Sequence, residues 1–209
     1  MSYIVVEGID GSGKSYLCNV LQELFERDER KVFGTSELPR TGVGEALNNI
    51  VKSDDYNVKP LTECLLFYAG RYEHINSIVK PKLKEGYTVI SDRSHVSSLA
   101  YNFAGRRCHP TSVVDHIVMG EVKITPDIYI FVDVDVKVAL ERVKHRGVAD
   151  RLERTIDMGA VKGYYRKFFG SKMGSNGCKV FILENNGCIE SFNKGIISLY
   201  EKIVVRESE

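Results

Sequence analysis

Short apolar runs alternate along the chain with longer segments in which apolar residues recur every three or four positions. The short runs predict five strands and the longer segments predict helices between them. The strands are expected at Tyr3–Val6, Lys31–Thr35, Tyr87–Ile90, Ile128–Val132 and Lys179–Leu183. Strands alternating with helices favour an α/β fold of three layers, in which a five-stranded parallel sheet is flanked by helices.

The helical segments are expected to bury one face each against that sheet. The predicted helices are one from Lys14 to about Phe25, Gly44–Val51, one from Pro60 to about Lys80, one around Ser97–Phe103, one from Thr111 or Ser112 through Met119, Val136–Arg146 with Asp135 as its cap, Val161–Lys172 and Ile189–Val205. On the long helix, the apolar stripe of Leu61, Leu65, Leu66, Ala69, Ile75, Ile78 and Val79 predicts the buried face.

Size and composition narrow the range of functions. A chain of 209 residues suits one domain, and a net charge of +1 favours neither nucleic acid nor a membrane surface as partner. No apolar run is long enough to span a bilayer, and the N-terminus is expected to be a core strand rather than a signal peptide. Five cysteines with no C-x-x-C pair favour reduced thiols in a cytoplasmic protein.

The first predicted strand leads into the full G-x-x-x-x-G-K-S phosphate-loop pattern of Gly8–Ser15. Its glycines let the backbone N–H groups approach phosphate oxygens, and the following helix directs its positive end at them. Lys14 is expected to bridge the β- and γ-phosphates, and the Ser15 hydroxyl to ligate Mg²⁺. The ATP-binding residues of this loop are then Gly8, Gly11, Ser12, Gly13, Lys14 and Ser15. The fold class becomes that of a P-loop NTPase.

Two aspartates end apolar strands and compete for the role of the second metal carboxylate. Asp92 is followed by Arg93, a natural phosphate ligand, and this favours Asp92 for the water shell of Mg²⁺. Asp133 is interpreted as strand-end solvation or as the partner of another cation. Neither an N-K-x-D guanine motif nor a separate D-x-x-G switch is present, which disfavours a GTPase.

Seven segments in order along the chain resemble the thymidylate kinases. They are EGIDGSGKS, ELPRTGVGEAL, LLFYAGRYEH, SDRSHVSSLAYN, TPDIYIFVDV, LERVKHRG and DRLE. The resemblance implies one kinase domain over residues 1–209 with a mobile lid at about 147–160. It implies transfer of the γ-phosphate of ATP to dTMP, giving dTDP for DNA precursor synthesis, with Mg²⁺ as cofactor, in a homodimer.

The resemblance also implies the acceptor-side residues. It assigns Asp10 to the 3′-hydroxyl, Arg71 to the base and acceptor phosphate, Phe67 to stacking on the pyrimidine, Arg93 to the acceptor phosphate and the transferred group, Tyr101 to exclusion of ribose, and Ser97 and Asn102 to the base. The acceptor phosphate is already anionic, so positioning and charge stabilisation are expected to suffice.

The phosphate loop has no arginine at its variable positions, so the resemblance places the catalytic arginine in the lid. Arg151 is the first candidate, and Arg146 and Arg154 are alternates. The expected catalytic set is Lys14, Arg93, Arg151 and Asp10. Arg142, one turn before Arg146, is expected near the adenine.

The sequence departs from the family pattern on the acceptor side. The common R-E-P-G-G-T loop is replaced by Ser36–Thr41, so Pro39 and Arg40 are expected to contact the acceptor, with Arg40 on its phosphate. Ser94 and His95 replace the more usual aromatic residue. Because a 5-methyl group adds only about 1–3 kcal/mol, we expect dUMP to be accepted beside dTMP.

Two other functions compete with this one. A deoxynucleoside kinase would attack with a neutral 5′-hydroxyl and need a carboxylate base, for which Glu37 is the candidate. Those enzymes usually carry a tryptophan near the base, and this chain has none. The third interpretation is a nucleotide-binding switch or a catalytically inactive scaffold, against which the presence of Lys14, Ser15, Asp92 and Arg93 argues.

Overall fold

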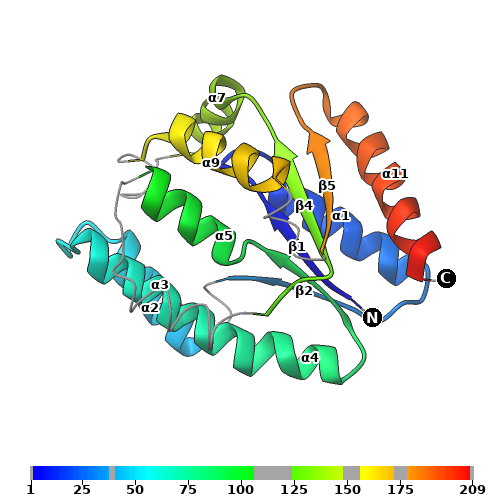
Figure 1. The fold of residues 1–209 in the computed structure, drawn as a ribbon, viewed down its shortest axis with the longest axis horizontal. Coiled ribbons are helices and arrows are strands. Elements are labelled where there is room, and N and C mark those ends of the chain that lie inside the picture. The colour runs from blue at the N-terminus through cyan, green and yellow to red at the C-terminus, as the bar shows by residue number, and fades with distance from the viewer. Residues whose placement is uncertain (1, 38–40, 106–123, 148–155, 172–177, 208–209) are drawn as a thin grey trace.

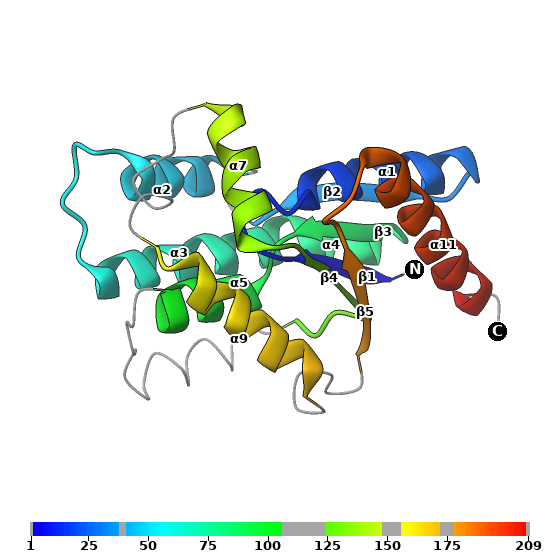
Figure 2. The same cartoon turned by 90° about the horizontal axis from the view of Figure 1, so that it is seen from above.

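A parallel five-stranded sheet forms the middle layer of the protein, with helices on both of its faces (Figures 1 and 2). The computed structural model describes residues 2–37, 41–105, 124–147, 156–171 and 178–207. The strand order is β2-β3-β1-β4-β5, and every pair is parallel. This confirms the fold class predicted from the sequence.

Each strand ends one or two residues later than its apolar run predicts. The strands are β1 Tyr3–Glu7, β2 Val32–Ser36, β3 Thr88–Asp92, β4 Ile128–Asp133 and β5 Lys179–Glu184. The added residues are polar, because the backbone ladder continues regardless of side-chain polarity. The polar ends of the strands lie at the edge of the sheet where an open α/β fold binds its ligands.

The helices follow the predicted order. They are α1 Lys14–Arg27, α2 Gly42–Lys52, α3 Pro60–His74, α4 Lys80–Lys84, α5 His95–Ser98, α7 Val136–Arg146, α9 Met158–Gly170 and α11 Ile189–Glu207, together with the π-helical segments η1 Ile75–Val79 and η2 Leu99–Gly105.

Alternate side chains of β1 supply two separate cores. Ile4 and Val6 pack with α1 and α11 on one face of the sheet. Tyr3 and Val5 pack with η1, α5, η2 and α9 on the other. A strand that is apolar on both faces is typical of the interior of a parallel sheet, so β1 is held rigidly where it delivers the phosphate loop.

The long helix predicted from Pro60 to about Lys80 is interrupted and continues further. The π-helical segment η1 separates α3 from α4. Pro81, in the first turn of α4, has no N–H to bond to the carbonyl of Ser77. A locally widened helix accommodates that missing bond, and the chain then continues in α4.

The apolar stripe predicted on the long helix is wrong for its first half. Leu61, Leu65 and Ala69 are exposed, whereas Ile75 and Val79 are buried as expected. The buried side of α3 instead carries Glu63, Cys64, Tyr68, Gly70, Arg71 and His74. Periodicity identifies an apolar stripe but not which way it faces, and here Arg71 and His74 on the opposite side of the helix line a small cavity.

Three further expectations have different outcomes. Asp135 occupies the N-cap position of α7, but its side chain makes no capping hydrogen bond and pairs with Lys162 instead. Helix α9 begins three residues before the predicted Val161, because Asp157 caps it by accepting from Ala160 N–H. The helix predicted through Met119 lies outside the described residues. Within the described part of the chain, no helix combines the length and apolarity that crossing a bilayer requires.

Candidate active site

The carboxyl end of β1 brings together loops that are distant in sequence. Val6 is in register with Asp92 of β3, and Glu7 with Phe131 of β4. The phosphate loop therefore emerges between the loops that follow β3 and β4. This is the topological switch point, where open α/β sheets bind ligands.

The phosphate loop has the backbone that its glycines predict. Gly8, Gly11 and Gly13 have φ of 154°, 78° and 94°. A Cβ on Gly11 would lie 2.3 Å from the carbonyl oxygen of Ala139, so α7 packs against the loop too closely for any side chain there. Lys14 is buried, and its Nζ donates to the carbonyl of Ile9 at 2.8 Å across the loop. Burial, followed by the charge of Arg93, lowers the pKa of Lys14.

Ser15 and Asp92 face each other across the mouth of the loop. The Ser15 hydroxyl donates to Asp92 Oδ2 at 2.6 Å, and Asp92 Oδ1 is buried with no hydrogen-bond partner among the described residues. Paired hydroxyl and carboxylate oxygens, one of them unsatisfied, fit a hard cation such as Mg²⁺ and its water shell.

Asp133, the other candidate carboxylate, forms ion pairs with two basic side chains of α9. Arg166 donates to its Oδ2 from Nε at 3.0 Å and from Nη2 at 2.8 Å. Lys162 Nζ lies 3.4 Å from its other oxygen. These contacts match the interpretation of Asp133 as the partner of another cation.

Asp10, Arg93 and Tyr101 form one cluster beside the phosphate loop. Arg93 pairs with Asp10 Oδ1, the Tyr101 hydroxyl donates to Asp10 Oδ2 at 2.9 Å, and the guanidinium lies 4.9 Å from the centre of the Tyr101 ring. Burial alone would raise the pKa of Asp10, but the charges of Arg93 and Lys14 outweigh it and lower that pKa. Within the cluster, the charge of Arg93 is balanced by the Asp10 carboxylate.

Arg93 adopts a left-handed backbone with φ of 81°, which is strained for a residue with a side chain. Its N–H donates to Val6 O at 2.9 Å, and its guanidinium donates to Gly8 O at 3.3 Å and to Ser97 Oγ at 3.0 Å. Strain of this kind persists only where surrounding contacts hold it, and it concentrates at functional sites.

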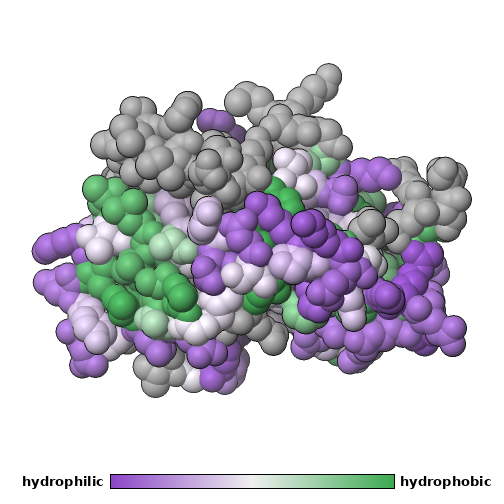
Figure 3. Space-filling view, turned by 90° about the horizontal axis from the view of Figure 1, so that it is seen from below, coloured by the Kyte–Doolittle hydropathy of each residue, from purple (hydrophilic) through white to green (hydrophobic). Residues whose placement is uncertain are grey.

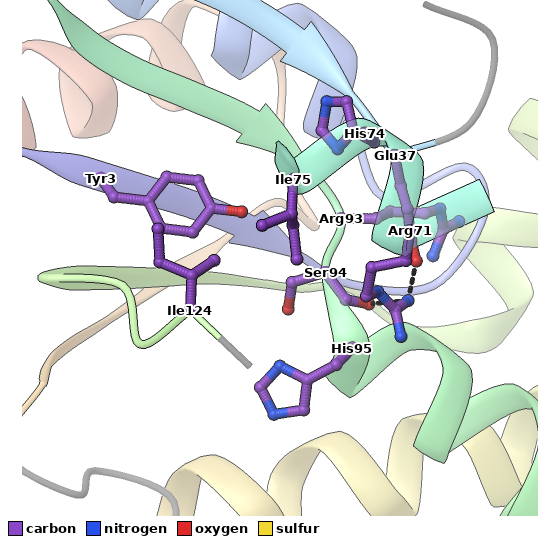
Figure 4. A pocket seen from close by; sticks show the side chains of 9 residues that line it. All are labelled: Tyr3, Glu37, Arg71, His74, Ile75, Arg93, Ser94, His95 and Ile124. Carbon is purple, nitrogen blue, oxygen red and sulfur yellow. Dashed lines mark hydrogen bonds and ion pairs between the residues drawn. The ribbon is translucent and has the colours of Figure 1, made fainter. Parts of the chain in front are cut away.

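Arg71 reaches from α3 into the same cleft and is 2% exposed (Figure 4). It pairs with Glu37 and donates from Nη2 to Ser94 O at 3.0 Å and to Ser98 Oγ at 2.9 Å. Its Nε and Nη1 have no hydrogen-bond partner within the described ranges. Burial lowers the pKa of Arg71 to about 10, so it stays charged at neutral pH.

A small cavity lies beside Arg71 and Arg93, and Ser94 and His95 are among its walls (Figure 4). These two residues are the ones that depart from the family's usual aromatic. The departure therefore falls on the wall of the cavity that Arg71 and Arg93 also line.

Two further residues that the resemblance assigns to the base lie on helical segments, Phe67 on α3 and Asn102 on η2. Phe67 is half-buried one turn before Arg71, and Asn102 is buried on η2, where its Nδ2 finds no partner in the described structure. Ser97, in contrast, is tied to Glu7 and Arg93 through its hydroxyl. The Ser97 hydroxyl thus lies between the Glu7 carboxylate and the Arg93 guanidinium.

Several candidate residues fall outside the described residues: Pro39, Arg40, Arg151 and Arg154. Of the other lid-side arginines, Arg146 is exposed at the end of α7, and its charge contributes to lowering the pKa of Asp10. Arg142 has a buried Nη1 without a hydrogen-bond partner in the described part of the chain.

Four residues that the structure ties to the site were assigned no role from the sequence. Ser98 accepts from Arg71, Glu7 accepts four hydrogen bonds beneath Arg93, Tyr165 of α9 joins Glu7, and Asn185 donates to Ser12 O at 2.8 Å. Glu7 carried a usable signal, because an acidic residue at the end of an apolar run needs hydrogen-bond partners if it is buried. The other three carried none, because their partners lie 27 to 173 positions away.

Comparisons with known proteins agree with this geometry. Residues 6–180 match the sequence profile of the thymidylate kinase family. The thymidylate kinase of Thermosipho africanus strain TCF52B is 34% identical over 202 residues, which cover 96% of this chain and 98% of that protein. The thymidylate kinase of Buchnera aphidicola subsp. Baizongia pistaciae is 36% identical over 177 residues, 82% of this chain and 84% of that protein.

A solved structure shows the same fold. The crystal structure of thymidylate kinase from Ehrlichia chaffeensis matches 97% of this chain and 98% of that chain with a TM-score of 0.71, at 24% sequence identity. A family profile across most of the chain and a relative at 34% identity over nearly all of it lead to one conclusion. This chain belongs to the thymidylate kinase family.

Proposed function

We propose that the protein transfers the γ-phosphate of ATP to dTMP and releases dTDP and ADP. The observation that carries this proposal is the arrangement of charge around one cleft. Lys14 reaches across the phosphate loop, Arg93 donates to Gly8 of the same loop, and Arg71 donates to Ser94 next to Arg93, so we assign Lys14 to the donor and the two arginines to the acceptor. Two anionic nucleotides can meet there without repelling each other.

The chemistry needs no proton acceptor. A nucleoside monophosphate attacks through a phosphate oxygen that is already anionic, so the protein has to align the reactants and stabilise the charge of the transferring group. In this proposal Lys14 contacts the phosphates of ATP, and Arg93 contacts the acceptor phosphate and the transferred group. Asp10 accepts from the 3′-hydroxyl of the acceptor, and Phe67 stacks on the base next to Arg71.

Mg²⁺ belongs to the proposed reaction. Ser15 and Asp92 would hold it and its water shell, and Asp92 Oδ1 offers an unpartnered, buried oxygen among the described residues. When bound, the ion would neutralise phosphate charge. The protein's own contribution is to fix the spacing of these two oxygen donors.

We assign to the lid one more positive charge, which stabilises the transferring phosphoryl group. We propose Arg151 for this role, since the phosphate loop has no arginine at its variable positions. Arg146, whose charge reaches Asp10, is the alternate among the described residues. Arg142 is proposed for the adenine side and Arg40, with Pro39, for the acceptor phosphate.

A coupled assay of ADP release with ATP and Mg²⁺ tests the proposal against its rival. Turnover with dTMP and none with thymidine is expected. Turnover with thymidine alone would support a deoxynucleoside kinase, but Glu37, the base that it needs, is paired with Arg71. ATP binding without transfer to any pyrimidine monophosphate would indicate a switch.

Selectivity for the methyl group is expected to be limited. A pocket gains only about 1–3 kcal/mol from one methyl group, so kcat/KM for dUMP should fall about 10- to 200-fold below that for dTMP. Steady-state kinetics at millimolar dUMP measure this ratio. The absence of measurable dUMP turnover would contradict the expectation.

We also propose that the protein acts as a cytoplasmic homodimer. Apolar atoms gather over α2 and α3 in the space-filling view (Figure 3). On α3, Leu61 and Leu65 are 43% and 46% exposed, and Ala69 and Tyr72 continue the same side of the helix. An exposed apolar face of this kind is typical of a protein interface. The cytoplasmic location rests on cysteine usage and on the need for ATP.

A further inference from the structure

Glu7 is a buried acidic residue at the centre of the site, and the proposed transfer gives it no role. It is the last residue of β1, immediately before Gly8, and it is 0% exposed. Burying a carboxylate is costly unless hydrogen bonds and charges compensate it. The groups that compensate the charge of Glu7 therefore indicate which residues this carboxylate holds in place.

Four hydrogen bonds converge on the Glu7 carboxylate. Oε1 accepts from the N–H and the hydroxyl of Ser94 at 2.8 and 2.7 Å. Oε2 accepts from the hydroxyls of Ser97 and Tyr165 at 2.6 and 3.0 Å. The N–H of Ser94 must donate, and the three hydroxyls are placed to donate, so the four contacts favour Glu7 as an ionised carboxylate. The pKa of Glu7 is raised overall, because burial outweighs the lowering effect of these hydroxyls and of the charge of Arg93.

Ser97 links this carboxylate to Arg93. A serine hydroxyl has one hydrogen, and the 2.6 Å contact assigns that hydrogen to Glu7. The lone pairs of Ser97 Oγ then face Arg93 Nη1 at 3.0 Å. The Tyr165 hydroxyl, 2.8 Å from Ser97 Oγ, shares its one hydrogen between that oxygen and Glu7 Oε2. The charge on Glu7 thus fixes the orientation of the hydroxyl that receives the guanidinium.

Ser94 provides a second link to the same arginine. Its N–H follows directly after Arg93, whose backbone is left-handed. By holding Ser94 N–H and Oγ together, Glu7 fixes the peptide that leaves this strained residue. Both the backbone and the side chain of Arg93 therefore depend on one carboxylate.

We propose that Glu7 is a positioning residue, which as a carboxylate holds Arg93 in its transfer geometry through Ser94 and Ser97. Tyr165 joins the same carboxylate from α9, the helix that follows the lid in sequence, and so connects that helix to Arg93. The inference rests on the proposed phosphoryl transfer, in which Arg93 contacts the acceptor phosphate. Glu7 itself does not touch the reactants.

The isosteric variant Glu7→Gln tests the charge with little change of volume. The backbone N–H of Ser94 cannot reverse its polarity, so the glutamine carbonyl takes that side and its amide nitrogen faces Ser97 and Tyr165. The hydroxyl of Ser97 must then turn its hydrogen away, and Arg93 loses both its ordered acceptor and a nearby negative charge. The effect should fall on transfer and spare ATP binding.

Steady-state kinetics with dTMP are expected to show kcat about ten- to a hundredfold lower in Glu7→Gln, with KM for ATP within about twofold of wild type. Ser97→Ala should lower kcat to a similar extent. The double variant should be no more than about twofold worse than the slower single variant, because both changes break the same link.

Tyr165→Phe and its matched control, Tyr200→Phe, each remove one phenol hydroxyl. Tyr165→Phe should lower kcat, whereas Tyr200→Phe should leave kcat unchanged, because the Tyr200 hydroxyl donates at 2.7 Å to Asp28 at the C-terminal end of α1. If Glu7→Gln fails to fold, Ser97→Ala and Tyr165→Phe decide the matter. Kinetics of Ser97→Ala indistinguishable from those of Tyr200→Phe would overturn the inference. A wild-type protein without dTMP turnover would instead contradict the proposed function.

Discussion

Asp10 contributes to stability through a charge that depends on pH. Its folded pKa lies below the ordinary value of 3.8, because Arg93 and Lys14 outweigh the effect of burial. A carboxyl group with a lowered folded pKa stabilises the native state above the unfolded pKa, and that contribution is lost as the pH falls through the folded pKa.

We therefore expect Asp10→Asn to lower the free energy of unfolding by about 2 kcal/mol at pH 7, since it leaves Arg93 without its charged partner. The difference from wild type should stay constant above about pH 5 and shrink as the pH falls below about 4. Urea unfolding across this range measures it. Glu23→Gln, on the exposed face of α1, shows the effect of removing a surface carboxyl group. A wild-type advantage that grows in acid would contradict the sign.

Arg151 is the residue on which the rate is expected to depend most. An arginine that contacts the transferring phosphoryl group contributes about 10³–10⁵ in rate in related systems. Arg151→Ala should therefore cut kcat by orders of magnitude and weaken dTMP binding only modestly. Arg27→Ala, at the exposed end of α1, is the control for loss of one arginine. An unchanged kcat in Arg151→Ala would move the role to Arg146 or Arg154.

Local patterns in the sequence predicted the donor side of the site better than the residues that support it. The phosphate loop is contiguous, so Lys14 and Ser15 could be assigned from spacing alone. The choice of Asp92 over Asp133 depended on Arg93 following it, and Arg166 explains the other aspartate. Ser98 and Tyr165 could not be found from spacing, because folding alone brings them to Arg71 and Glu7.

At the scale of elements, the sequence predicted where helices form, but it did not predict which face of a helix is buried. Helix α3 shows both outcomes: it begins at Pro60 as predicted, yet Leu61 and Leu65 point outward. Its buried face carries Glu63, Arg71 and His74, two of which line the cavity beside Arg93, so the usual burial of apolar residues does not hold on this helix. Pro81 interrupts the continuous helix that the apolar spacing predicts, because it lacks the N–H that the helix needs.

Two glycines differ in how closely other atoms approach them, so replacing each with alanine should have opposite effects on stability. Gly11→Ala would place Cβ against the backbone of Ala139, at a φ of 78° that side chains avoid. We expect it to destabilise the protein and weaken ATP binding. Gly163 lies inside α9, and apart from the helix's own backbone no atom of the described residues lies within 4 Å of an added Cβ, so Gly163→Ala should raise the free energy of unfolding by about 1 kcal/mol.

Thermal unfolding with and without ATP separates the two effects. A change of 1 kcal/mol corresponds to about 2–4 °C in Tm for a protein of this size. Gly163→Ala should raise Tm and keep the shift that ATP produces, whereas Gly11→Ala should lower Tm and lose most of that shift. A stabilising Gly11→Ala would contradict the packing of the phosphate loop against α7.

At the scale of the whole molecule, composition and alternation sufficed for the architecture. Each apolar run became one strand of the sheet, because a parallel strand must be covered on both faces and so leaves a continuous apolar signature. The order β2-β3-β1-β4-β5 places the strand that carries the phosphate loop at the centre. The pattern could not show which apolar helix face stays exposed to solvent in one chain, because apolar residues of an interface and of the core look alike in sequence.

The exposed apolar side of α3 leads to the last prediction, that the protein dimerises through this face. Leu65→Glu would bury a charge in the proposed interface, and a buried unpaired charge is strongly unfavourable. Ile197→Glu on α11 is the matched control, since both side chains are 46% exposed on a helix. Analytical ultracentrifugation at micromolar concentration should find wild type and Ile197→Glu as dimers and Leu65→Glu as a monomer. A monomeric wild type would remove the proposal, and a dimeric Leu65→Glu would place the interface on another face.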